Sequence, residues 1–267
     1  MMKRLTMALA GILVVASSLA AVAEDAADLA KKLSNPVASM ISVPFQFNYD
    51  NEIGPDRDGE RFQLNIQPVV PISLDEDWTM ISRTILPVID QDNIFPGAGE
   101  QFGLGDITQS LFFSPKHPGP SGIIWGLGPV FLLPIGTDEL LSAEKWGAGP
   151  TLVVLKQSGG WTFGALANHI WSFAGDDDRD EVSATFLQPF LSYTTPDAWT
   201  FGVNSEASYD WEAEEWSIPV NFSVSKLVTL GHQPVSLGAT LRYWADSPDT
   251  GPHGFGGRAV ITFLFPG

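Results

Sequence analysis

The sequence predicts an all-β fold, an antiparallel transmembrane β-barrel of about 12 strands that follows a cleaved signal peptide. Three observations lead there: a secretory N-terminus, long segments in which apolar and polar residues alternate, and connections that are alternately long and short. Although 44% of the residues are hydrophobic, no stretch after the N-terminus approaches the length of a spanning helix. The apolar residues are therefore expected to lie on strands.

The N-terminus has the three parts of a secretory signal peptide. Lys3 and Arg4 form a basic start, Leu5–Leu19 an apolar stretch, and Ala21–Ala23 a small-residue cleavage motif. A transmembrane helix is the alternative, but the apolar stretch is short and is followed by acidic rather than basic residues. We therefore expect cleavage after residue 23.

One domain is expected after the signal peptide. The predicted organisation is a signal peptide (1–23), a short N-terminal periplasmic segment (24–39) and an outer-membrane barrel (40–267). Helix signals in the mature chain are confined to Asp25–Leu33, which Asn35 and Pro36 terminate. This segment either plugs the periplasmic mouth of the barrel or forms a loose tail.

Charge and composition exclude several classes of function. The formal net charge is −17, so the chain has no basic surface that could replace the counterions of a nucleic acid. Cysteine is absent, which excludes disulfides and thiolate metal sites. The acidic run 176–181 lacks the spacing of a known calcium loop and is interpreted as a solvated loop. No metal or cofactor is expected.

Proline and glycine clusters divide the mature chain into segments of strand length. The predicted strands are 40–50, 60–71, 78–89, 102–114, 122–134, 145–156, 161–174, 181–194, 199–211, 215–227, 235–245 and 254–265. Connections after the odd-numbered strands are longer or acidic, and those after the even-numbered strands are mostly tight. An even number of strands with short turns at one end is typical of outer-membrane barrels.

Aromatic residues at both ends of two strands measure the thickness of the lipid-facing band. Odd positions of WTFGVNSEASYDW (199–211) are mainly apolar and even positions polar, and ten tilted residues span roughly 25 Å. A soluble β-sandwich also alternates, but its strands are shorter and its aromatics lie in the core. The predicted aromatic girdle is Trp161, Phe163, Trp171, Phe173, Trp199, Phe201, Tyr209 and Trp211.

Several long blocks resemble a known family. They include SNPVASMISVPFQFNYD (34–50), EKWGAGPTLVVLKQ (144–157), GALANHIWSFAG (164–175) and SKLVTLGHQPVSLGATLRYWADSPDTGP (225–252). The chain resembles proteobacterial outer-membrane "transporter" barrels, the putative MetA-pathway of phenol degradation proteins that are often mislabelled neuromedin U. The resemblance implies transport of small aromatic or organic compounds and brings no functional residues. The terminal Pro266–Gly267 departs from the aromatic end common in outer-membrane strands.

Charged residues at inward-facing positions are the candidate site. The predicted pore-lining residues are Arg61, Arg83, Asp106, Glu206, Asp210, Arg242 and Arg258. Either they form an internal salt-bridge network that fills a narrow barrel, or they form a charged constriction that selects solutes.

Two of these arginines are expected to face each other. If their hairpin turns about Pro248–Asp249, Arg242 lies opposite Arg258, which is unfavourable unless an anion lies between them. That anion is Glu206, Asp210 or a passing solute. We expect the two arginines to line the narrowest part of the pore.

Enzymatic activity is not expected. An outer-membrane lipase needs a serine beside a histidine and a polar orienting group. Only His169 lies within a predicted strand, on the lipid-facing side and near Phe186, and no triad accompanies it. A structural or adhesive role without transport remains an alternative function for the barrel.

The function predicted from sequence is passive diffusion of small solutes through a polar, charge-lined lumen. A barrel of this size is expected to be a narrow or gated channel. The expected partners are outer-membrane lipid, lipopolysaccharide, the barrel-assembly machinery and a small-molecule solute. We expect a monomer in the bacterial outer membrane that binds no nucleic acid.

Overall fold

The computed structural model describes residues 26–265, so the expected signal peptide (1–23) lies outside the described residues. Apart from one short helix, 26–33, the described chain is built of strands. The strands are β1 (Ile41–Ile53), β2 (Gly59–Ile66), β3 (Val69–Ser73), β4 (Trp78–Asp92), β5 (Glu100–Leu104), β6 (Ile107–Pro115), β7 (Ile123–Leu133), β8 (Lys145–Ser158), β9 (Trp161–Gly175), β10 (Ser183–Thr194), β11 (Trp199–Ser205), β12 (Ala207–Asp210), β13 (Glu215–Leu230), β14 (Gln233–Asp246) and β15 (Phe255–Phe265).

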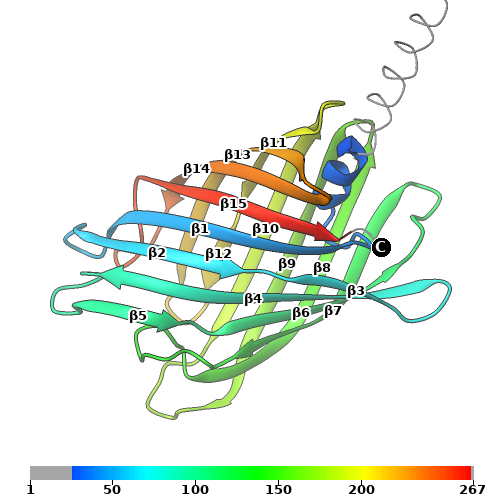
Figure 1. Ribbon diagram of the computed structural model, residues 1–267. Helices are drawn as coiled ribbons and strands as arrows, with labels where there is room; N and C mark the ends of the chain where they lie inside the picture. The colour runs from blue at the N-terminus through cyan, green and yellow to red at the C-terminus, as the bar shows by residue number, and fades with distance from the viewer. Residues whose placement is uncertain (1–25, 266–267) are drawn as a thin grey trace, which may run out of the picture.

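The strands form one closed antiparallel barrel (Figure 1). Neighbours in the chain pair with one another, and β1 pairs with β15 over Ile41↔Phe265 to Tyr49↔Gly257, which closes the sheet. β2 with β3, β5 with β6, and β11 with β12 each continue one span, so the barrel has twelve spans. The predicted fold class is confirmed.

Three predicted strands are wrong in one respect, because each is interrupted. Segment 60–71 breaks at Gln67–Pro68, where proline has no N–H to donate to the ladder. Segment 102–114 breaks at Gly105–Asp106, and 199–211 breaks at Glu206. The break at Glu206 inserts no extra residue, because the pairing with β13 keeps one register on both sides of it. The inward and outward faces are therefore preserved along the whole span.

The two ends of the barrel differ in their connections. One end, called here the short-turn end, carries the turns 74–77, 159–160, 195–198 and 231–232 and one longer connection, 116–122. The opposite, long-loop end carries 54–58, 93–99, 134–144, 176–182 and 247–254 and one short turn, 211–214. In outer-membrane barrels the short turns face the periplasm. The turn at Gly231, whose φ is 66°, is tighter than the predicted connection 228–234 because β13 and β14 each extend further.

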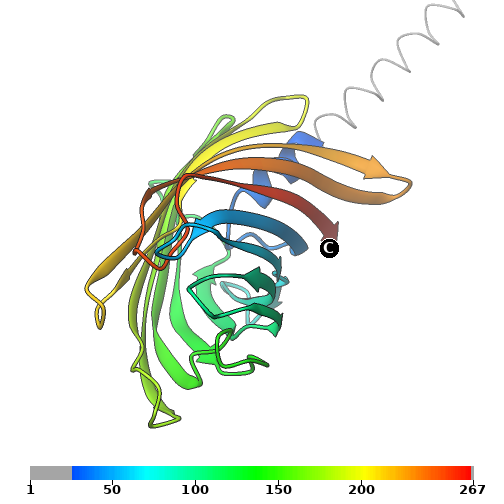
Figure 2. The same cartoon turned by 90° about the vertical axis from the view of Figure 1, so that its left-hand side faces the viewer.

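Helix 26–33 lies at the short-turn end, against the inside of the barrel (Figures 1 and 2). Its residue Ala30 is buried in a cluster with Met40, Ala198, Leu227 and Leu264, which come from the N-terminal segment, a short turn and two strands. No helix within residues 26–265 is long and apolar enough to cross a membrane.

Two glycines allow neighbouring strands to approach closely. A Cβ atom at Gly149 of β8 would lie 1.8 Å from the backbone oxygen of His169 in β9. A Cβ atom at Gly128 of β7 would lie 1.9 Å from the backbone oxygen of Leu111 in β6. Both oxygens belong to the backbone, so a side chain at either glycine forces two strands apart.

Gly149→Ala is therefore expected to lower the free energy of unfolding by about 1–3 kcal/mol, the usual cost of overpacking. Urea titration of the protein in detergent micelles measures it. Gly119→Ala is the matched control, because a Cβ atom there meets nothing within 4 Å. Equal stability of the two variants would contradict the close approach.

Candidate functional site

A buried arginine, Arg242 of β14, organises the interior of the barrel towards the long-loop end. Its Nη1 atom donates to both carboxylate oxygens of Asp50, at 3.0 and 2.8 Å. Its Nε donates to Asn221 Oδ1 and its Nη2 to Asn48 Oδ1, both at 3.1 Å. Trp244 Nε1 donates to the same Asp50 at 3.0 Å. Asp50 and Arg242 thus neutralise each other inside the barrel.

Glu206 joins a second arginine to this group. Both terminal nitrogens of Arg258 donate to the Glu206 carboxylate, at 2.9 and 2.6 Å, and Arg258 Nε donates to Asn48 at 2.6 Å. Arg242 Nη2 lies 3.6 Å from Glu206. Glu206 stands on the β11–β12 span and Arg258 on β15, with β13 and β14 between them, so the pair crosses part of the lumen. We call Asp50, Glu206, Arg242, Arg258 and Asn48 the cross-lumen network.

The predicted direct pairing of Arg242 with Arg258 is wrong. Arg242 lies opposite Gly256, and Arg258 lies opposite Thr240, because the hairpin register is shifted by two residues. The two arginines are diagonal neighbours on the inner face instead. Of the three candidate anions, Glu206 is the one that lies between the two arginines.

The other predicted pore-lining acids lie apart from this network. Asp106 accepts from Gly136 N, Ser142 Oγ and Ala143 N at 2.7–3.0 Å, so it holds the 134–144 loop at the break between β5 and β6. Asp210 is exposed at the end of β12 and accepts from the backbone N–H groups of 212 and 213 in the turn.

Arg61 and Arg83 lie on the inner face without an ion pair among residues 26–265. Arg61 of β2 donates from Nε to Gln91 Oε1 at 2.8 Å. Arg83 of β4 makes one long contact, 3.4 Å, with Gln67 Oε1. The predicted lumen cations therefore divide into a paired set and an unpaired set.

Asp50 is a member of the network that is absent from the predicted pore-lining residues. The predicted first strand ends at this residue, but β1 runs on to Ile53. Asp50 shares the inward phase of Asn48, so strict alternation along a longer strand could have identified it.

A chamber of about 370 Å³ lies between the cross-lumen network and the long-loop end. Its wall comes from β1, β2, the β11–β12 span, β13, β14 and β15, and the 247–254 loop covers it. We call it the outer chamber; its lining residues include Asn48, Asp50, Arg61, Gln63, Asn65, Glu206, Ser208, Ser217, Arg242, Trp244 and Arg258.

The N-terminal segment lies inside the lumen at the short-turn end. Val37 is buried against Ile81, Phe112, Val153 and Leu166 on the inner wall. The wall has room for Val37 because Gly126 lies behind it: a Cβ atom there would be 3.1 Å from Val37 Cγ1. The apolar wall and the absence of a side chain at Gly126 thus make room for Val37 and hold the segment in place.

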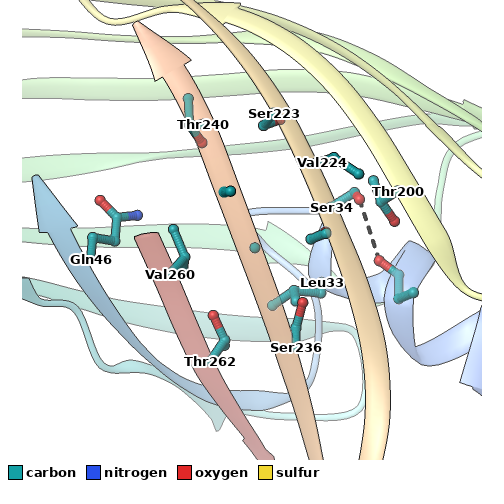
Figure 3. A pocket seen from close by; sticks show the side chains of 14 residues that line it. Leu33, Ser34, Gln46, Thr200, Ser223, Val224, Ser236, Thr240, Val260 and Thr262 are labelled. Atoms are coloured by element: carbon teal, nitrogen blue, oxygen red, sulfur yellow. Dashed lines mark hydrogen bonds between the residues drawn. The ribbon is translucent and has the colours of Figure 1, made fainter. Parts of the chain in front are cut away.

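Two smaller pockets, of about 270 and 160 Å³, flank this segment. Figure 3 shows the larger one, where Leu33 and Ser34 of the segment face hydroxyl and small side chains of β11, β13, β14 and β15. Gln157 Nε2 donates to the backbone oxygen of Lys31 at 2.8 Å and ties the helix to β8. The segment therefore narrows the lumen at this end.

The predicted girdle aromatics lie on the outward positions of β9 and the β11–β12 span. Trp161, Phe163, Trp199 and Phe201 lie near the short-turn end. Trp171, Phe173, Tyr209 and Trp211 lie near the long-loop end. All are exposed except Tyr209, which packs against Trp211 and Trp216 with ring centroids 4.9 Å apart.

His169 belongs to this outer aromatic group. The centroid of its ring lies 4.0 Å from the ring centroid of Trp171, and its Nδ1 atom lies 2.7 Å from Thr185 Oγ1. The expected neighbour, Phe186, is wrong by one residue, because β9 and β10 pair His169 with Thr185. Ser172 faces the other side of the sheet and bonds to Glu181. No serine hydroxyl contacts His169 within the described chain.

Two ion pairs hold the loops at the long-loop end. Lys145, buried at the start of β8, contacts Glu181 at 2.9 Å, and Arg179 lies 3.5 Å from Glu144. Arg179 also donates to the backbone oxygens of Glu139 and Ser142. The 134–144 and 176–182 loops are thus joined. Over residues 26–265, no group of three or more metal-ligating side chains could hold a metal ion.

Comparison with solved structures identifies the fold. The chain is similar to the COG4313 outer membrane channel from Pseudomonas putida F1, with 12% identity over 85% of this chain and 96% of that one and a TM-score of 0.67. It is also similar to the NanC porin (9% identity, 84% and 98% covered, TM-score 0.50). A third similar structure is the outer membrane phospholipase A from Escherichia coli (10% identity, 84% and 90% covered, TM-score 0.50).

At these identities the likeness shows the fold, and no family model and no curated protein matches the chain. The MetA-pathway family that the sequence resembles therefore stays a prediction. The closed barrel, its apolar outer face and its structural neighbours together assign the chain to the bacterial outer membrane.

Glu206→Gln is expected to lower the free energy of unfolding by about 3 kcal/mol, because it leaves a buried arginine without its counter-charge. Urea titration in micelles measures the change. Glu212→Gln, in the exposed turn after β12, is the matched control and should be neutral. The double variant Glu206→Gln/Arg258→Gln should recover part of the loss. Additive losses would contradict a direct pair.

The loop contacts lower the pKa of Glu181, chiefly through the hydrogen bond from Ser172 and then through Lys145. A lowered pKa means that these contacts favour the ionised form, so the attachment exists above the usual carboxyl pKa and is lost as pH falls through the lowered value. Ser172→Ala and Lys145→Met should therefore each raise the pKa of Glu181. NMR titration of the Glu181 carboxyl carbon tests this, and an unchanged pKa in both variants would contradict it.

Proposed function

We propose that this protein is a narrow outer-membrane channel through which small polar solutes diffuse passively. The observation that carries the proposal is a polar interior with charged groups and cavities inside a closed barrel whose outer face is apolar. A barrel that served only as an anchor could fill its lumen with apolar side chains at no desolvation cost. Polar cavities along the axis are instead what a water-filled path requires.

The path is narrow at two places of different chemistry. The cross-lumen network lies beneath the outer chamber, and the N-terminal segment lies at the short-turn end. The charged barrier consists of hydrogen-bonded, mutually neutralised groups, and the second barrier consists of apolar contacts around Val37. Both favour small solutes over large ones. The segment 24–39 acts in this proposal as a periplasmic gate that follows the cleaved signal peptide.

Two of the similar structures support a channel, because one is described as an outer membrane channel and the other as a porin. The resemblance to the MetA-pathway family adds small aromatic or organic compounds as the solutes. The phospholipase neighbour shares the fold, and the hydroxyl beside His169 in this chain belongs to Thr185 rather than to a serine. We infer a channel without enzymatic activity. Hydrolysis of phospholipid by the purified protein, lost in His169→Ala, would overturn that inference.

The barrel needs few partners for this role. Membrane lipid contacts the outward aromatics, and lipopolysaccharide meets the acidic loops through bridging divalent cations. The barrel-assembly machinery inserts the chain, which then acts as a monomer because one barrel contains the whole path. Cross-linking in outer membranes tests the monomer.

Val37→Asp is expected to raise the single-channel conductance severalfold in a planar bilayer, because it places a charge among buried apolar side chains and releases the N-terminal segment. Deletion of residues 26–36 should have the same effect. Leu74→Asp, an exposed position in a short turn at the same end, is the matched control and should conduct like the wild type.

Two results would count against the channel. If neither the wild type nor the opened variants conduct, the barrel is not a pore. If the wild type conducts fully and the deletion changes nothing, the segment does not narrow the path.

A further inference from the structure

The outer chamber contains more positive than negative charge. Three arginines line it, Arg61, Arg242 and Arg258, against two carboxylates, Asp50 and Glu206. Both carboxylates are already engaged: Asp50 accepts from Arg242 and Trp244, and Glu206 accepts from Arg258. The chamber therefore has one cationic side chain beyond those its own carboxylates neutralise.

Arg61 is that cation. In the ladder it lies opposite Asp50, but the Asp50 carboxylate is bonded to Arg242, and no ion pair forms between Asp50 and Arg61. Its one side-chain hydrogen bond within the described chain runs from Nε to Gln91. The two terminal nitrogens, with four N–H donors between them, have no acceptor among the described residues.

Further polar groups surround the same space. Ser208 and Ser217 are ladder partners on the β11–β12 span and β13, and both line the chamber. Asn65 also lines it, and its side-chain oxygen is taken up by Gln63 Nε2 at 2.7 Å, which leaves its amide nitrogen as a donor. Besides the terminal nitrogens of Arg61, the chamber therefore offers the Asn65 amide nitrogen and two serine hydroxyls as donors, whereas the Gln63 side-chain oxygen and the hydroxyls can also accept.

We propose that the outer chamber binds small organic carboxylates, with the terminal nitrogens of Arg61 as the main ligand of the carboxylate group. The proposal rests on the channel function and names the class of solute. A guanidinium group presents two parallel N–H donors that match the two oxygens of a carboxylate. One surplus charge suits a monoanion, and a chamber of about 370 Å³ is large enough for a small organic acid.

This assignment moves anion selection away from the arginines that the sequence suggested. Arg242 and Arg258 have their donors occupied by Asp50, Asn48, Asn221 and Glu206. They hold the wall of the chamber in shape. Arg61 stands on the same wall and remains available to a solute.

The experiment measures binding of ¹³C-labelled acetate to the full-length mature protein in detergent micelles, by NMR line broadening. Acetamide has nearly the same shape without the charge, and methylammonium has the opposite charge, so neither should bind. Arg61→Gln should weaken acetate binding by roughly tenfold or more, because it removes a charge-assisted bidentate contact. Arg61→Lys should fall between Arg61→Gln and the wild type.

Arg57→Gln is the matched control, because Arg57 is an exposed residue in the loop of the same hairpin. It should bind acetate like the wild type. Heat-modifiable migration in gels checks that each variant has folded, and Arg61→Lys keeps the test valid if Arg61→Gln fails to fold. Equal binding by wild type, Arg61→Gln and Arg61→Lys, or equal binding of acetate and acetamide, would overturn the site.

Bilayer recording separates this inference from the channel function. Reversal potentials in a potassium acetate gradient should show a lower permeability to acetate relative to potassium in Arg61→Gln than in Arg57→Gln. If Arg61→Gln abolishes acetate binding but the wild type carries no current, the binding site is supported and only the channel function is refuted. If the wild type conducts but acetate binding does not depend on residue 61, only the binding site is refuted.

Discussion

Closure of the sheet is the constraint on which every other feature of this protein depends. In hydrocarbon, each unpaired backbone N–H or C=O group costs several kcal/mol, so a strand can cross a bilayer only when both of its edges are paired. The pairing of β1 with β15 removes the last free edge. Once the sheet is closed, alternate side chains must point into a lumen, and the chemistry of that lumen follows from the polar half of each strand.

Closure also explains the charge pairs. Inward positions bring arginines and carboxylates from distant strands into a confined space, where an unpaired charge is costly and a hydrogen-bonded pair is tolerated. Glu206 and Arg258 are 52 residues apart in sequence and meet through this geometry. The lumen has apolar side chains around Val37 at one end and charged groups at the other. In the proposed channel, a solute would pass two barriers that respond to different properties.

The parts predictable from sequence were those set by local periodicity. Alternation located the twelve spans and the outward aromatics, because both depend on residues two apart in one strand. Contacts between strands were less accessible. The hairpin of Arg242 and Arg258 was shifted by two residues, since its loop contains several prolines and glycines and its turn cannot be located from composition alone. Asp50 was missed because β1 extends further than its alternation suggested.

The choice between a plug and a loose tail for the N-terminal segment could not be made from sequence for a different reason, because the site that holds the segment depends on a missing side chain. Val37 fits against the wall where Gly126 has no side chain, and neither residue stands out in its own segment. Residues 37 and 126 therefore form a pair that should be compared jointly across related barrels. A chain with a bulky residue at the position of Gly126 cannot seat a valine as this one does. The bore of such a relative at the short-turn end can thus be anticipated from two aligned positions.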